Sequence, residues 1–350
     1  MVNIDLLRSI VQAPGIPGRE DAVRSVVAEA MRPLVDELRV DALGNLIGKK
    51  TGSGGPSVMV SAHLDEIGFL VKYIDDHGFL RLQPVGGFDP RVLVAQRADI
   101  HTRSGDVIPA LVQPAAKPIH VLNPGDPKDV KIEDIFLDTG LTPDAVRAAI
   151  SIGDWVTLQS TTEILGGVVS SKALDDRVNV YIIIEALKRL GPHAADIYFV
   201  ASTQEEVGLR GAGTAAFGID PEIGIALDVT LAGDIPGFTP DSQVSKLHDG
   251  VAIKFFDSSH ISNPMLNDHL REIAEEKGIP HQIEILSRGG TDAGAIQRVR
   301  AGVAVTTLSV PTRYLHTVNE TASLADIDAT IDLLVAFLET AGSRSYAYTI

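Results

Sequence analysis

The sequence predicts an α/β protein whose sheet is covered by helices on both faces, with a small all-β domain inserted into it. After Leu165, apolar runs typical of buried strands alternate with segments that repeat apolar residues at helical spacing. Before Leu165, about one hundred residues consist mostly of short β-rich runs separated by Gly, Pro and Asp turns. We therefore expect a discontinuous main domain of residues 1–66 and 166–350, interrupted by a β domain of residues 67–165.

The first part of the main domain is predicted to contain helices followed by a buried strand. The helices are broken at residues 14–18, where two Pro-Gly-type turns occur, and apolar residues recur at helical spacing after that break. An extended segment follows at about residues 37–49. Residues 57–62 form a short apolar run typical of a buried strand, and this run leads directly into His63.

The remaining elements follow from the same periodicities. In the insert, we expect strands near residues 69–74, 79–82 and 98–101, a hairpin turn at 76–78 and a short helix at 143–150. In the second part of the main domain, we expect helices at 176–190, 264–277, from 292 and at 324–340, and strands at 197–202, 223–227, 251–256, 282–286 and 303–310.

The composition excludes several functional classes. The chain has no cysteine, which excludes a disulfide framework, a thiolate zinc site and a cysteine nucleophile. Its 30 basic and 46 acidic residues give a formal charge of −16, which is unfavourable for binding nucleic acid or anionic lipid. Its N-terminus resembles a helix rather than a signal peptide, and no apolar stretch approaches 18 residues. We therefore expect a soluble cytoplasmic protein.

Histidines and carboxylates follow the ends of several predicted strands. Ligands of open α/β sheets bind outside the carboxyl ends of the strands, so five segments that are distant in sequence are expected to meet at one edge. The residues concerned are His63, Asp65, Asp175, Asp176, Glu205, Glu206, Asp228 and His316.

Imidazoles and carboxylates without a thiolate suit zinc, cobalt or manganese in a site that is open to water. Five or more ligands exceed the needs of one four-coordinate zinc, whereas two metals about 3.5–4 Å apart, sharing a carboxylate, would use them all.

Taken singly, each residue has a simpler explanation: a histidine can be structural, a Glu-Glu pair can face solvent, and Asp175 with Asp176 can cap a helix. Asp228 is harder to explain, because a buried carboxylate at the end of an apolar strand needs a partner.

Six segments of the sequence, in order and with matching spacing, resemble the TET-type (tetrahedral) dinuclear metallo-aminopeptidases. This family includes glutamyl and deblocking aminopeptidases, and some of its members carry the names cellulase M-like or endoglucanase. The segments are SAHLDEIGFLV (61–71), SKALDDRVN (171–179), TQEEVGLRGA (203–212), ALDVT (226–230), GGTDAGAIQ (289–297) and RYLHTVNE (313–320). The resemblance implies a zinc-peptidase-like mixed sheet, a PDZ-like dimerisation domain in the insert, and a homododecamer built from dimers.

The resemblance also implies a role for each candidate residue. Asp175 would bridge two divalent ions, with zinc expected first and cobalt or manganese as alternatives. One ion would be completed by His63 and Asp228, and the other by Glu206 and His316. Asp65 would orient His63 from behind, and Glu205 would be the general base. The peptide bond between Asp175 and Asp176 would be cis.

These assignments favour an aminopeptidase that removes N-terminal residues from peptides through a hydroxide bridging the two metals. A two-metal amidohydrolase or deacylase acting on a small amide, and a non-catalytic assembly protein, remain as alternatives. A glycosidase requires two facing carboxylates rather than a histidine-rich ligand set. Members of the family with different residue preferences share the six motifs, so the motifs do not determine which N-terminal residue is removed.

Overall fold

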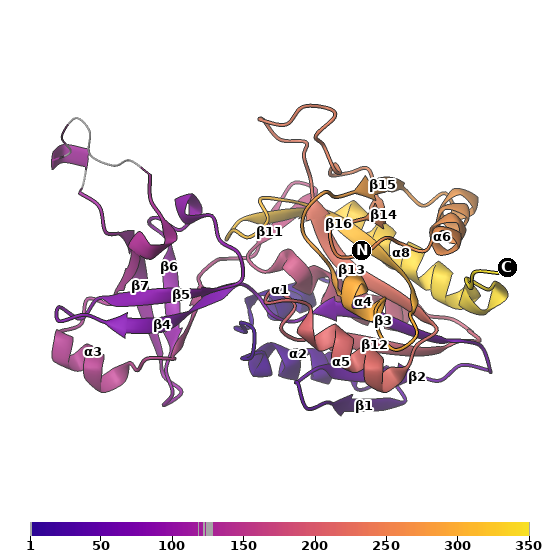
Figure 1. Cartoon of the computed structure of the whole chain (residues 1–350), viewed down its shortest axis with the longest axis horizontal. Helices are drawn as coiled ribbons and strands as arrows, with labels where there is room; N and C mark the ends of the chain where they lie inside the picture. The colour runs from indigo at the N-terminus through magenta and orange to yellow at the C-terminus, as the bar shows by residue number, and fades with distance from the viewer. Residues whose placement is uncertain (1, 118, 122, 124–128, 350) are drawn as a thin grey trace.

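The structure is a computed structural model of the chain that describes residues 2–117, 119–121, 123 and 129–349. It contains a large α/β body and a smaller β body that lie side by side along the longest axis of the molecule (Figure 1). The β body is formed by a continuous stretch of the chain, whereas the α/β body contains both ends of the described sequence.

The α/β body is built on a mixed sheet that has eleven strands within the described residues. Nine of them follow the order β1-β2-β12-β3-β13-β16-β17-β11-β10, and β14 joins β16 and carries β15 at its outer edge. The strands are β1 (Glu37–Val40), β2 (Leu46–Lys50), β3 (Ser57–His63), β10 (Glu163–Leu165), β11 (Val168–Ser171), β12 (Asp196–Ser202), β13 (Ile223–Leu231), β14 (Val251–Phe256), β15 (His281–Ile285), β16 (Ala304–Arg313) and β17 (Glu320–Ser323).

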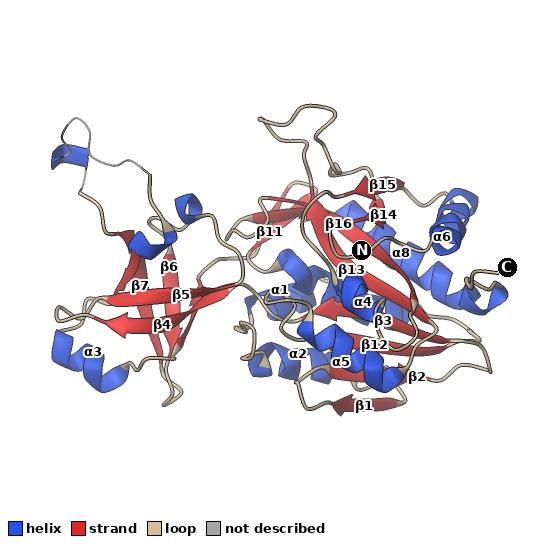
Figure 2. Cartoon of the chain, viewed as in Figure 1, coloured by secondary structure: helices blue, strands red, loops and turns tan. Residues whose placement is uncertain are grey.

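Helices cover both faces of this sheet (Figure 2). Residues on opposite faces of β3 show the two layers: Val58 packs into the cluster of α1, α2, α4, α6 and α8, and Met59 packs into that of α5 and α7. The helices are α1 (Ile4–Gln12), α2 (Asp21–Met31), α4 (Leu174–Arg189), α5 (Arg210–Ile219), α6 (Pro264–Lys277), α7 (Asp292–Ile296) and α8 (Leu324–Thr340). Because β3 is buried on both sides, its sequence is nearly continuous in apolar residues instead of alternating. The predicted α/β class and mixed sheet are confirmed.

The central strands run parallel, which determines where their ends lie. β3 pairs in parallel with β12 on one side and β13 on the other, and β13 pairs in parallel with β16. In this register, Ser202 at the end of β12 lies opposite His63 at the end of β3. Residues that follow these strands are therefore delivered to one edge of the sheet.

The β body is a closed six-stranded barrel in the described part of the insert, with its own apolar core. Its strands are β4 (Gly68–Ile74), β5 (Leu80–Val85), β6 (Arg97–His101), β7 (Val107–Pro114), β8 (Ile135–Asp138) and β9 (Trp155–Leu158), and the short helix α3 (Pro143–Ala149) packs beside them. The next strand, β10, pairs with β11 of the large sheet and not with the barrel. The PDZ-like form of the insert, and the domain limits at 66/67 and 165/166, stay predictions.

One strand differs from its expected length in a way that matters for the site. The apolar run predicted a strand that ends before Asp228, but β13 continues to Leu231 because its partner β16 also continues, pairing Leu231 with Thr312. Asp228 is therefore a buried residue inside a strand. No helix of the described residues is long and apolar enough to cross a membrane.

Candidate metal centre

Five segments bring the predicted ligands together at the carboxyl edge of the parallel strands. His63 is the last residue of β3, Glu205 and Glu206 lie just beyond the end of β12, and Asp228 lies in β13. Asp175 is near the start of α4, just after β11. His316 lies in the connection between β16 and β17, which form an antiparallel pair.

Asp175 occupies the centre of this group. Its Oδ1 lies 3.1 Å from Nε2 of His63, and its Oδ2 lies 3.3 Å from Nε2 of His316. Nε2 of His316 is also 3.3 Å from Oε1 of Glu206. Each oxygen of the Asp175 carboxylate thus faces a different imidazole, which is the arrangement required of a carboxylate that bridges two ions.

The potential ligand atoms form three groups, each within a mutual distance of 4.8 Å. His63, Asp175 and Asp228 form one, and Asp175, Glu206 and His316 form another. The third combines His63, Glu205 and Glu206. Bonds of about 2.0–2.2 Å in tetrahedral geometry place neighbouring ligand atoms roughly 3.3–3.6 Å apart, and the distances around Asp175 are close to this. The first two groups, which share Asp175, match the two predicted ligand sets.

The charge of the cluster also suits divalent cations. Asp175, Glu205, Glu206 and Asp228 are largely buried, and within the described residues no lysine or arginine lies at ion-pair distance from them. Burial raises the pKa of Asp228 well above its ordinary value, and the nearby Asp175 raises it further. Burial likewise raises the pKa of Glu205, against the effect of His63. Carboxylates crowded in this way require a cation to remain charged.

The pKa values of the two imidazoles are raised as well, but by the surrounding carboxylates and not by burial. Burial lowers the pKa of His63, but the carboxylates of Glu205, Asp175 and Asp65 outweigh it and raise that pKa well above the ordinary value. The pKa of His316 is raised to about 12, because Asp175 and Glu206 outweigh the effect of burial. In the absence of a metal, protons therefore take the place of cations between these ligands.

Asp65 has a different environment from the predicted one. Its carboxylate oxygen is 3.7 Å from Nδ1 of His63, too far for a hydrogen bond, and the backbone carbonyl of Asp65 accepts from that nitrogen at 3.0 Å. Its two carboxylate oxygens instead accept the backbone N–H groups of Glu205 and Glu206, each at 3.1 Å. Asp65 therefore orients His63 through its main chain and holds the Glu205-Glu206 segment with its side chain.

Two further buried carboxylates position the ligands, and the sequence did not single them out for this task. Asp176 accepts the backbone N–H of His63 through Oδ2 at 3.1 Å. Glu320 accepts the backbone N–H of His316 through Oε1 at 2.8 Å and that of Asp175 through Oε2 at 3.0 Å. Asp176 was already among the predicted candidate residues, whereas the only signal for Glu320 was its position inside the motif at residues 313–320. The peptide bond between Asp175 and Asp176 is cis, as predicted.

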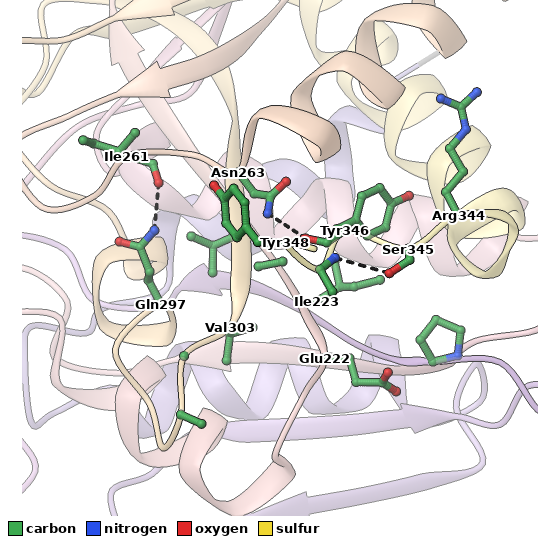
Figure 3. A pocket seen from close by; sticks show the side chains of 16 residues that line it. Glu222, Ile223, Ile261, Asn263, Gln297, Val303, Arg344, Ser345, Tyr346 and Tyr348 are labelled. Atoms are coloured by element: carbon green, nitrogen blue, oxygen red, sulfur yellow. Dashed lines mark hydrogen bonds between the residues drawn. The ribbon is translucent and has the colours of Figure 1, made fainter. Parts of the chain in front are cut away.

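The cluster opens into a cavity of about 620 Å³. A second cavity, of about 570 Å³, lies at the opposite end of the parallel strands, next to the start of β13 at Ile223 and the C-terminal segment (Figure 3). There, Asn263 donates a hydrogen bond to the carbonyl of Tyr346. Among its lining residues, Glu222 is the only one of a metal-ligating type. The candidate site is therefore the first cavity.

Comparison with known proteins places the chain in a family. The profile of the M42 glutamyl aminopeptidases matches residues 44–333. The chain belongs to the M42 glutamyl aminopeptidase family. This M42 chain is similar to a lysyl aminopeptidase from Pyrococcus furiosus. The two are 38% identical over 349 residues, which cover 97% of each protein.

Two solved structures are similar over nearly their whole length. An aminopeptidase from the archaeon Desulfurococcus kamchatkensis has a TM-score of 0.91 at 38% identity and covers 96% of this chain and 94% of its own. The TET1 peptidase of Pyrococcus horikoshii, described as assembling into a tetrahedron or a large octahedral shell, has a TM-score of 0.84 at 32% identity and covers 96% and 98%. The predicted family and the prediction of an aminopeptidase are confirmed. M42 enzymes are metallopeptidases, and the clusters around Asp175 could hold a metal.

Proposed function

We propose that this M42 enzyme removes N-terminal residues from peptides with two divalent ions per chain. The observation that carries the proposal is the position of Asp175, whose two carboxylate oxygens belong to two different ligand groups. His63 and Asp228 would complete one ion, and Glu206 and His316 the other. Bound at these positions, the two ions would hold the free α-amine of the substrate, polarise the scissile carbonyl and activate the attacking water.

Glu205 belongs to neither proposed ligand set and would act as the general base. It lines the cavity, and its Oε2 is 3.8 Å from Nε2 of His63, so it reaches the cluster from the side that faces substrate. Glu205 would take a proton from the water that attacks the carbonyl carbon. It would return this proton to the nitrogen of the leaving peptide as the C–N bond breaks. The carboxylate of Asp65 would hold the backbone of both glutamates in position for these separate roles, because it accepts the backbone N–H of Glu205 and of Glu206.

Metal content and activity test this proposal directly. The purified protein would be stripped with a chelator, reloaded with zinc, cobalt or manganese, and assayed with a panel of aminoacyl chromogenic substrates. We expect about two ions per chain and activity only in the loaded protein. His316→Ala should reduce the metal content from about two ions per chain toward one. A stripped protein that retains full activity would disprove the two-metal function.

The proposal extends to assembly. Large apolar side chains of the insert are exposed at Tyr73, Val107, Leu111 and Ile152. Of these, Val107 and Leu111 lie on one strand, β7, and would offer an apolar contact to another subunit. Together with the assembly stated for the TET1 relative, this supports a dimer formed through the insert and a homododecamer of tetrahedral form. Light scattering should give a particle of about twelve times the 37.2 kDa chain. A stable monomer at working concentrations would contradict this.

A further inference from the structure

The imidazoles of the two ligand groups are oriented in the same way but from different parts of the chain. Nδ1 of His63 lies 3.0 Å from the backbone carbonyl of Asp65, two residues further along the same segment. Nδ1 of His316 lies 2.8 Å from the backbone carbonyl of Gly87, which is 229 residues away and belongs to the insert. A carbonyl can only accept a hydrogen bond, so Nδ1 is the donor in each ring, and Nε2 is the atom that faces Asp175. One imidazole is therefore oriented locally and the other by the insert.

The connection that carries His316 needs support from its surroundings. It links β16 to β17, and both Tyr314 and His316 have a φ angle of +60°. This left-handed conformation is unfavourable for a residue with a Cβ atom and persists where surrounding contacts hold it. At the start of the connection, Nε of Arg313 lies 2.8 Å from Oδ1 of Asp234 in the α/β body. On the other side of His316, the connection is held by the insert.

Val318 joins this connection to the barrel. Its side chain is buried and belongs to the apolar core of the barrel, although the residue lies between two strands of the large sheet. Its backbone carbonyl accepts a hydrogen bond from the hydroxyl group of Ser160 at 2.7 Å, and Ser160 follows the barrel strand β9. Two residues after His316, the chain is thus held by the insert through both a side chain and a main-chain group.

The segment that presents the carbonyl of Gly87 is itself fixed within the insert. It follows β5, and the ring of Phe88 stacks on Phe69 of the barrel core, with 4.3 Å between the ring centroids. Gly86 has a φ angle of +90°, and a Cβ atom there would lie 2.5 Å from Cγ2 of Ile67. A larger residue at this position would therefore displace the segment. The position of the Gly87 carbonyl is thus set by the packing of the barrel.

We infer that residues 86–88 of the insert are a positioning element for His316, so that affinity for the ion of His316 depends on the packing of the insert and affinity for the ion of His63 does not. A hydrogen-bond partner of a metal-ligating imidazole fixes the ring and its tautomer, and its loss typically costs roughly 10–100-fold in metal affinity. The inference rests on the proposed function and deepens it: the insert would be part of the catalytic unit as well as of the subunit interface.

The test removes the support of this segment and leaves every proposed ligand in place. Phe88→Ala removes the aromatic stack, and Gly86→Ala displaces the backbone of the segment. Phe88→Leu also removes the stack but keeps an apolar side chain, so it tests the same contact with less disturbance of the barrel core. The matched control is Phe79→Ala, which removes a ring that packs edge-to-face on Phe136 at 5.0 Å and that lies at the opposite end of β5 from the segment.

Competition with a chelator would give the affinity of each protein for its two zinc ions, with the melting temperatures of the metal-free forms as a measure of general destabilisation. We expect Phe88→Ala and Gly86→Ala to weaken one ion by about tenfold or more and the other by less than about threefold, with a smaller effect of Phe88→Leu in the same direction. Phe79→Ala should leave both affinities within about threefold of the wild type. The visible absorption of the cobalt-loaded protein should change in the segment variants and not in the control, because the ring of His316 would be displaced.

Double variants test whether the segment acts through His316. His316→Ala removes the group that the Gly87 carbonyl orients, so the addition of Phe88→Ala should cause no further loss of the remaining ion. A further loss as large as that caused by Phe88→Ala alone would show that the segment acts on the whole cluster, and would overturn the inference.

Failure of the inference is distinguishable from failure of the proposed function. If the wild type binds about two ions per chain and is active, but Phe88→Ala and Gly86→Ala retain both affinities, the inference is overturned while the proposed function stands. Equal weakening by Phe79→Ala would overturn it as well, because a general loosening of the barrel would then explain the effect. If the loaded wild type binds fewer than two ions or cleaves no aminoacyl substrate, the proposed function fails and the inference fails with it.

Discussion

The carboxylate of Asp65 accepts the backbone N–H of Glu206 at 3.1 Å, with its other oxygen bound to the N–H of Glu205. One buried side chain therefore fixes the two adjacent glutamates whose proposed tasks differ. His63, two residues earlier in the chain, is bound by the main chain of Asp65 instead.

Glu205 and Glu206 should respond differently to the same substitution. Glu205→Gln should keep both ions and the fold, while turnover falls by roughly 10²–10⁴-fold, because a general base is lost without loss of a ligand. Glu206→Gln should weaken one ion, so its activity should partly return in excess metal. Metal stoichiometry and turnover would be measured for both variants with and without added ion. Loss of a metal from Glu205→Gln, with both retained in Glu206→Gln, would show that the roles are reversed.

Asp65→Asn should disturb the glutamates more than His63. The amide nitrogen of asparagine cannot accept a hydrogen bond, so one of the two backbone N–H groups loses its partner, at a cost of about 1–3 kcal/mol for a buried group. We expect turnover to fall about tenfold and the ion of Glu206 to bind more weakly. Asp176→Asn is the matched control, since Asp176 holds the backbone of His63. Titration calorimetry should show different binding steps weakened in the two variants; the same step weakened in both would contradict this assignment.

Glu320→Gln should weaken metal binding without weakening the metal-free fold. Glutamine keeps the shape of the side chain but can accept from only one of the two backbone groups, His316 N–H or Asp175 N–H. Because Asp175 is shared by both ligand groups, we expect at least a tenfold loss of affinity for the ion of His316, measured by competition with a chelator. The melting temperature of the metal-free variant at pH 8 should equal or exceed that of the wild type, since a buried carboxyl group has been removed. Unchanged metal affinity would show that Glu320 has no positioning role.

The metal-free protein should lose stability as the pH rises from about 5 to 8. Burial and the neighbouring Asp175 raise the pKa of Glu320 from 4.5 to about 8, and burial raises the pKa of Glu205 and Asp228 as well. In this window the folded state binds more protons than the unfolded state, so the free energy of unfolding falls with rising pH. The pKa of His316, raised from 6.5 to about 12, acts in the same direction above pH 6.5.

Divalent ions should reverse this dependence, because they replace the protons and bind the ionised ligands. Urea unfolding of the stripped and reloaded protein at several pH values measures both effects. A stripped protein that becomes more stable between pH 5 and 8 would contradict the proton-for-metal exchange at this cluster.

The sequence by itself determined the α/β class and most of the elements, and it indicated which side chains would meet at the site. An apolar run as short as the one before His63 is typical of a strand buried between two helical layers, and this signal is local. Parallel strands then deliver their following residues to one edge, so His63, Glu205 and Glu206 could be placed together before any contact was known. Strand ends were less well determined, because the length of β13 depends on its partner β16.

Only the tertiary structure decided which atoms meet. The pairing of each Asp175 oxygen with a different histidine depends on side-chain conformations fixed by residues more than a hundred positions away in the sequence. The tasks of Asp65 and Glu320 depend on backbone N–H groups of distant loops, and no pattern in the sequence reports such contacts.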